Sequence, residues 1–126
     1  MQHPELEKFG AFVISKLWDS ALEHHDLVAE AHWKAPALQN LQNELAALSE
    51  KQKEIVRRCV VEALRDGLHD FLLALHEAHD SKKGIEIFVD GKNIAELSDG
   101  LQGEPYGSDG WIAKYGKHQN NEEQPS

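Results

Sequence analysis

The sequence predicts an α+β fold, in which about three N-terminal helices pack on a small C-terminal antiparallel β-sheet. Apolar residues recur at spacings of three and four through the first two-thirds of the chain, as they do on one face of a helix. After Gly84 the pattern changes to alternation, which is typical of a strand. Because the helices come first and the strands last, we expect one α+β domain over residues 1–117.

The first predicted helix begins at Pro4, a residue that suits the first turn of a helix, and ends near Trp33. Its predicted apolar stripe contains Leu6, Phe9, Val13, Leu17 and Ala21. Pro36 disfavours helical geometry in the residue before it, so the chain bends there. Leucines between 38 and 48 then define a second, shorter helix.

A third helix is predicted to begin at Ser49, which forms a capping-box pattern with Gln52. It continues to about Ala78 and is the expected spine of the core. Gly67 lies inside it and either costs about 1 kcal/mol within a continuous helix or caps and splits the segment. We expect a continuous helix.

Strands are expected after the third helix. Residues 85–89 alternate between apolar and polar positions, and Asp90-Gly91 is typical of a tight hairpin turn. A second strand is predicted over Asn93–Leu97 and a third over Gly110–Tyr115. The helices are expected to cover one face of this sheet.

Charge and composition limit the classes of function. The chain has 126 residues and a net charge of −9, which argues against binding nucleic acid. The acidic charge fits a solvated, soluble surface best, and attraction to a basic protein partner is the alternative. Cys59 is the only cysteine, so no disulfide framework is expected, and its place on an apolar helix face predicts burial. The start lacks a signal-peptide pattern and no apolar run is long enough to span a membrane, so we expect a cytoplasmic protein. Residues 118–126 are polar and are predicted to form a disordered tail.

Motifs for enzyme chemistry are missing from the sequence. It contains no Gly-x-Ser-x-Gly, phosphate loop or His-Glu-x-x-His, so no cofactor is predicted and a non-enzymatic role is favoured. The alternative is a metal-dependent enzyme or sensor that uses His69, His76 and His79, whose helical spacing and acidic neighbours are compatible with metal binding. The same pattern also fits a solvated histidine stripe. A second histidine group includes His25, which we expect to be exposed or packed against Trp18.

The C-terminal third contains a short repeat. Ser98-Asp99-Gly100-Leu101 and Ser108-Asp109-Gly110-Trp111 are each followed by a Tyr-Gly pair. Asp-Gly pairs favour turns, and aromatic residues among acidic ones are typical of protein interfaces, although these rings must also supply core. The predicted partner-binding residues are Asp99, Glu104, Tyr106, Asp109, Trp111 and Tyr115.

Two stretches carry a resemblance: LHDFLLALHE at 68–77 and IFVDGKNIAELSDGLQGEPYGSDGWIAKYGK at 87–117. They resemble small, acidic, uncharacterised bacterial proteins, some of which are similar to immunity proteins that neutralise a toxin of the same cell. The resemblance implies a bacterial cytoplasmic protein that acts by binding. Immunity proteins share no single motif, so it assigns no functional residue.

The leading hypothesis is therefore a protein-binding module, either a toxin-neutralising immunity protein or a regulatory protein. The metal-dependent alternative remains open. A third hypothesis is self-association through leucines left over on the third helix, namely Leu68, Leu72, Leu73 and Leu75.

Overall fold

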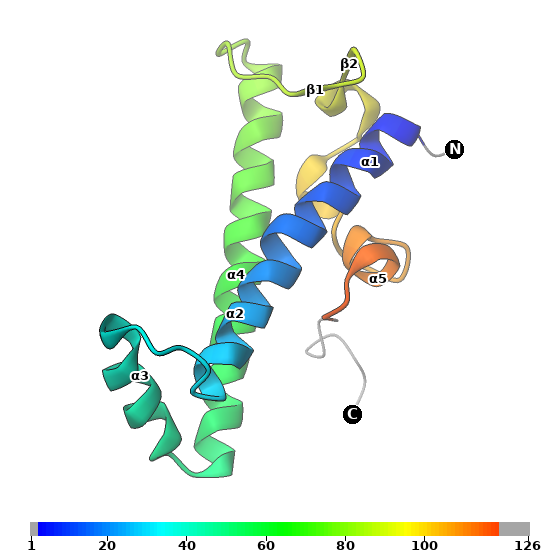
Figure 1. The fold of residues 1–126 in the computed structure, drawn as a ribbon. Helices are drawn as coiled ribbons and strands as arrows, with labels where there is room; N and C mark the ends of the chain where they lie inside the picture. The colour runs from blue at the N-terminus through cyan, green and yellow to red at the C-terminus, as the bar shows by residue number, and fades with distance from the viewer. Residues whose placement is uncertain (1–2, 119–126) are drawn as a thin grey trace.

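The computed structural model describes residues 3–118 and confirms the α+β class, with helices first and a two-stranded sheet near the C-terminus (Figure 1). The N-terminal rod is one continuous helical segment with a π-helix in its middle. A short helix then leads into α4, the longest element. The helical elements in this part are α1 (Pro4–Val13), the π-helix η1 (Ile14–Asp19), α2 (Ser20–Ala29), α3 (Pro36–Ala46) and α4 (Glu50–Asp80).

The helix boundaries follow local chemistry. Pro4 and Pro36 each stand in the first turn of a helix, where a missing N–H costs nothing. The rod ends at Ala29, earlier than the predicted Trp33, and Ala31 has a positive φ of 57° that no helix continues.

The predicted capping box of α4 is confirmed. Ser49 Oγ accepts a hydrogen bond from Gln52 N at 3.1 Å, and Gln52 Oε1 accepts one from Ser49 N at 2.9 Å. The predicted continuity of α4 through Gly67 is also confirmed. This glycine is exposed, and a Cβ atom added to it would meet nothing within 4 Å. It therefore costs helix stability, about 1 kcal/mol relative to Ala, without relieving any contact inside the chain.

The sheet is smaller than predicted. β1 (Phe88–Val89) and β2 (Lys92–Asn93) pair antiparallel, and the turn between them has positive φ at both Asp90 and Gly91, as a type I′ hairpin requires. The second predicted strand is wrong beyond Asn93, because residues Ile94–Leu97 form the 3₁₀-helix η2. The Asn93 side chain accepts a hydrogen bond from Ala95 N at 3.0 Å and so turns the backbone out of the extended conformation.

The third predicted strand is also wrong. After the 3₁₀-helix η3 (Leu101–Gly103), the segment Trp111–Tyr115 forms the short helix α5. Two backbone hydrogen bonds tie its start to the preceding loop: Trp111 N donates to Glu104 O and Ile112 N to Pro105 O, both at 3.0 Å. These backbone groups therefore bond within a compact loop and do not pair with a neighbouring β-strand.

The core lies where the rod, the C-terminal half of α4 and the C-terminal segment meet. Trp18 and Trp111 are its largest side chains, and both are buried. Trp111 packs directly over Gly10, where a Cβ atom would lie 2.4 Å from the ring carbon Cε2. Phe9 meets the same ring edge-on at a centroid distance of 5.9 Å. Only glycine at position 10 therefore lets α1 approach this tryptophan.

The apolar stripe of the rod differs from the predicted one. From Leu6 to Leu22 the stripe is buried at Leu6, Gly10, Ile14, Trp18 and Leu22, at a constant spacing of four, whereas Leu17 is 41 % exposed. Val28 is also buried but lies outside this spacing. A spacing of four drifts around a regular α-helix, and the π-helix η1 adds the extra residue that moves Trp18 toward the core.

Cys59 is a second correction, since its side chain is exposed and not buried as predicted. The predicted disordered tail, residues 118–126, lies outside the described residues except for His118. Within the described part of the chain, no helix is both long enough and apolar enough to cross a bilayer.

Candidate functional site

The C-terminal segment is anchored to η1 by a carboxylate that the sequence did not single out. Asp19 is buried, and its two oxygens accept hydrogen bonds from the backbone N–H of Lys117 and that of His118, at 3.0 Å. Beside it, Trp18 Nε1 donates to His118 O at 2.5 Å. Trp18 and Asp19 are consecutive residues of the π-helix, and both hold the backbone of the C-terminal segment against the rod.

Tyr115 also serves this anchoring. Its hydroxyl and the Lys114 ammonium group both donate to Glu7 Oε1 on α1. Burial raises the pKa of Glu7, but the hydrogen bonds from Lys114 and Tyr115 outweigh it and hold this pKa below its ordinary value. The hydrogen bond to Glu7 raises the pKa of Lys114 in return.

The structure does not gather the six predicted partner-binding residues on one surface. Trp111 is 1 % exposed, so its prediction as a contact is wrong, because the ring fills the space above Gly10. Asp99 and Asp109 are exposed, while Glu104 is half-buried and accepts a hydrogen bond from Ser98 Oγ. Tyr115 contacts α1, whereas Tyr106 contacts α4.

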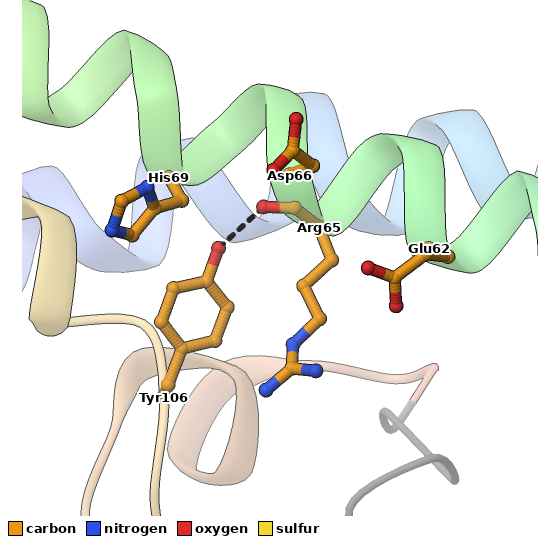
Figure 2. Close-up of a pocket in the computed structure, with 5 residues that line it drawn as sticks. All are labelled: Glu62, Arg65, Asp66, His69 and Tyr106. Carbon is orange, nitrogen blue, oxygen red and sulfur yellow. Dashed lines mark hydrogen bonds between the residues drawn. The ribbon is translucent and has the colours of Figure 1, made fainter.

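Tyr106 forms one wall of an open pocket on α4. Its hydroxyl donates to the backbone carbonyl of Arg65 at 2.7 Å, and the Arg65 guanidinium lies 5.2 Å from the ring centroid, within cation–π distance. Figure 2 shows the tyrosine reaching across to α4, with Glu62 on one side of Arg65 and His69 on the other. The pocket has a volume of about 340 Å³ and is lined by Glu62, Arg65, Asp66, His69 and Tyr106.

A second, shallower depression adjoins this pocket on α4. Its volume is about 600 Å³, and it shares Glu62 and Asp66 with the first. Ile55 is 42 % exposed here, and Cys59 and Ala63 are also exposed. We call the residues lining this depression the open face of α4: Ile55, Arg58, Cys59, Glu62, Ala63 and Asp66.

The three histidines of the metal alternative have separate partners. His69 Nδ1 lies 3.2 Å from Asp70 Oδ1, and His76 Nδ1 accepts a hydrogen bond from Leu101 N at 3.2 Å. His79 Nδ1 lies 2.7 Å from Glu86 Oε1. Within residues 3–118, no three His, Cys, Asp or Glu side chains are grouped as metal ligands.

His79 and Glu86 instead connect the end of α4 to the segment before the hairpin. Glu86 Oε1 also accepts a hydrogen bond from the Asn93 side chain. The hydrogen bonds from His79 and Asn93 lower the pKa of Glu86. This group has a structural explanation, since it joins α4 to β2.

The second histidine group packs against a different tryptophan from the one predicted. The rings of His24 and His32 contact Trp33, at centroid distances of 5.8 and 4.9 Å. His25 is half-buried and lies 3.0 Å from Asp26, which also accepts a hydrogen bond from Arg57 at 3.0 Å. Burial raises the pKa of Asp26, but the hydrogen bonds from Arg57 and His25 outweigh it and lower this pKa overall.

Comparison with protein-family models, curated proteins and solved structures found no match to this chain. The chain is a small α+β protein, and the Tyr106 pocket adjoins the open face of α4 on its described surface. Sequence reasoning found Tyr106 but missed Glu62 and Asp66 as site residues. Their signal was two acids four residues apart on the polar side of a helix, which is common on solvated surfaces.

Proposed function

We propose that this protein binds another protein, as an immunity or regulatory protein does, and that the partner inserts a basic side chain between Tyr106 and the open face of α4. The observation that carries this proposal is the position of Glu62 and Asp66, which line both depressions. They stand four residues apart on one exposed face of α4, and neither has an ion pair within the described residues. Like charges at this spacing repel, and a cation from a partner would relieve that repulsion.

Tyr106 supports the same proposal. Tyrosine and arginine are enriched among residues that dominate binding energies, because they offer a large contact area together with polar groups. The hydrogen bond to the Arg65 carbonyl already holds the Tyr106 ring, so binding would immobilise little additional side-chain freedom.

Charge supports a basic partner. The chain carries −9, and Asp99 and Asp109 are exposed on the same segment as Tyr106. An acidic surface speeds association with a basic protein and repels nucleic acid. These carboxylates would therefore act on the association rate, whereas Glu62 and Asp66 would contact the partner.

Affinity capture from the native host's lysate tests the proposal. The tagged wild-type protein should retain one specific protein in near-equal amount, less at moderate than at low salt. Glu62→Gln combined with Asp66→Asn should lose that protein. The control is Glu30→Gln combined with Glu44→Gln, which makes the same change in charge at exposed positions outside α4. Retention of the partner by the first variant would refute the assigned face.

A further inference from the structure

We propose that the partner on the open face of α4 is a second copy of this chain, with the two α4 helices packed antiparallel about a two-fold axis near the level of residue 61. This inference rests on the proposed function, because it names the partner of the same site. Both copies carry −9, so the partner is not a protein of basic net charge, and the basic side chain that enters the site is Arg58 of the second copy. It commits to self-association through a face that the sequence did not single out.

Two of the four leucines predicted to drive self-association lie in the core, since Leu68 and Leu72 are each 1 % exposed. In the N-terminal half of α4 the exposed apolar residues are those of the open face, where Ile55, Cys59 and Ala63 follow one another at spacings of four. Residues at this spacing form the ridge that packs into the grooves of a second helix.

Charge complementarity identifies the occupant. Arg58 lies on the open face beside Glu62 and, like the two acids, has no ion pair within residues 3–118. In an antiparallel pair centred at residue 61, Arg58 of one copy lies level with residue 64 of the other, between Glu62 and Asp66. The two-fold axis repeats this contact, so the Arg58 of each copy meets Glu62 and Asp66 of the other copy. A face that carries one cation and two anions in this order, none of them ion-paired within the described part of the chain, is complementary to itself.

Shape agrees with charge. With the same centre, Cys59 of one copy lies level with Ala63 of the other, and both side chains are small and exposed. Small residues at these positions allow the two helices to approach closely.

Complementary charge reversals test the pairing. The molecular mass should be measured by analytical ultracentrifugation from low micromolar to submillimolar concentration. Wild-type protein should be a dimer at the upper end. Arg58→Glu alone should be monomeric, because the new carboxylate faces two acids of the other copy at each contact, and Glu62→Arg with Asp66→Arg should be monomeric for the converse reason. An equimolar mixture of the two variants should form a heterodimer, since every contact then joins opposite charges. Lys92→Glu, an exposed change on β2, should leave the wild-type dimer intact.

A steric variant provides an independent readout. Ala63→Trp places a large side chain at an exposed position of the open face, where it would meet Cys59 of the second copy. It should fold as the wild type does and weaken dimerisation by at least about tenfold. The rate of Cys59 alkylation should also fall as the wild-type concentration rises, because the dimer covers this exposed thiol.

The outcomes separate the two proposals. A wild-type protein that is monomeric throughout, yet retains a lysate partner that the Glu62→Gln/Asp66→Asn variant loses, would overturn the second copy and keep the protein-binding role. A monomer that retains no partner would overturn both. A dimer that survives both charge reversals, or reversals that do not restore a heterodimer on mixing, would overturn the pairing. A heterodimer formed only on mixing would support it.

Discussion

The two halves of α4 differ in what covers them. In the C-terminal half, Leu68 and Leu72 lie under η3 and are almost completely buried. In the N-terminal half, Ile55 and its neighbours line an open depression. The C-terminal segment runs beside α4 only in its upper part (Figure 1), and Tyr106 contacts it at Arg65. Apolar residues recur at helical spacing along the whole of α4, but whether they are buried depends on whether another segment packs over them.

The largest expected effect compares a leucine of the covered half with an isoleucine of the open half. Leu72→Ala should lower the free energy of unfolding by about 2–5 kcal/mol, because it leaves a cavity in the core. Ile55→Ala should change that free energy of the monomer by only about 0.5 kcal/mol. Urea unfolding at low protein concentration measures both. Equal losses would show that the side of the helix that carries Ile55 is also part of the core.

Replacing each of the two helix glycines by alanine should change the stability in opposite directions. Gly10→Ala should destabilise the protein by about 1–3 kcal/mol, because the new methyl group would overlap the Trp111 ring. Gly67→Ala should stabilise the monomer by about 1 kcal/mol, since alanine is the better helix former and nothing lies near it. Thermal unfolding of the two variants gives the sign directly. A destabilised Gly67→Ala monomer would contradict the open environment described for this position.

The attachment of the C-terminal segment can be weakened at one residue. Asp19→Ala leaves the N–H groups of Lys117 and His118 without their acceptor and should cost about 1–3 kcal/mol. Hydrogen exchange at these two amides should become faster than in the wild type. Asp99→Ala, an exposed change in the same segment, serves as the control and should leave their exchange unchanged.

The smallest predicted effect is a dependence on pH. Glu7 has an ordinary pKa of 4.5, which is lowered in the folded protein. The unfolded chain therefore takes up a proton first as the pH falls. The stability that Glu7 contributes is present above about pH 4.5 and is lost as the pH falls through the lower folded value. Glu7→Gln should reduce the loss of stability between neutral pH and pH 4 or below, measured by urea unfolding. An identical pH profile would argue against this pair.

Local patterns predicted the local structure well. The capping box at Ser49, the continuity of α4 and the hairpin at Asp90-Gly91 depend on neighbouring residues, and all three are confirmed. Trp111 and Cys59 were misplaced because their burial depends on which segment packs over them. A pattern of spacings cannot supply that information. Alternation also failed in the C-terminal third, where short-range hydrogen bonds such as that of Asn93 compete with a ladder.

The open face of α4 was missed for the same reason. Ile55, Cys59 and Ala63 form a regular apolar row, which predicts core, but within residues 3–118 all three are exposed. Tyr106 was found because an aromatic residue beside Asp-Gly turns is unusual enough to stand out. Its contact with Arg65 joins residues 41 positions apart and has no signal in the sequence.

In the π-helix of the N-terminal rod, the number of residues should matter more than which residues they are. Ser15 and Lys16 are exposed, so many side chains should be accepted there. Removing either residue would instead restore a regular helix and rotate all of α2 by about 100° relative to α1. Trp18 and Asp19 would then point away from the backbone that they hold. Genetic variation in this stretch should therefore consist of substitutions, with single-residue insertions and deletions selected against.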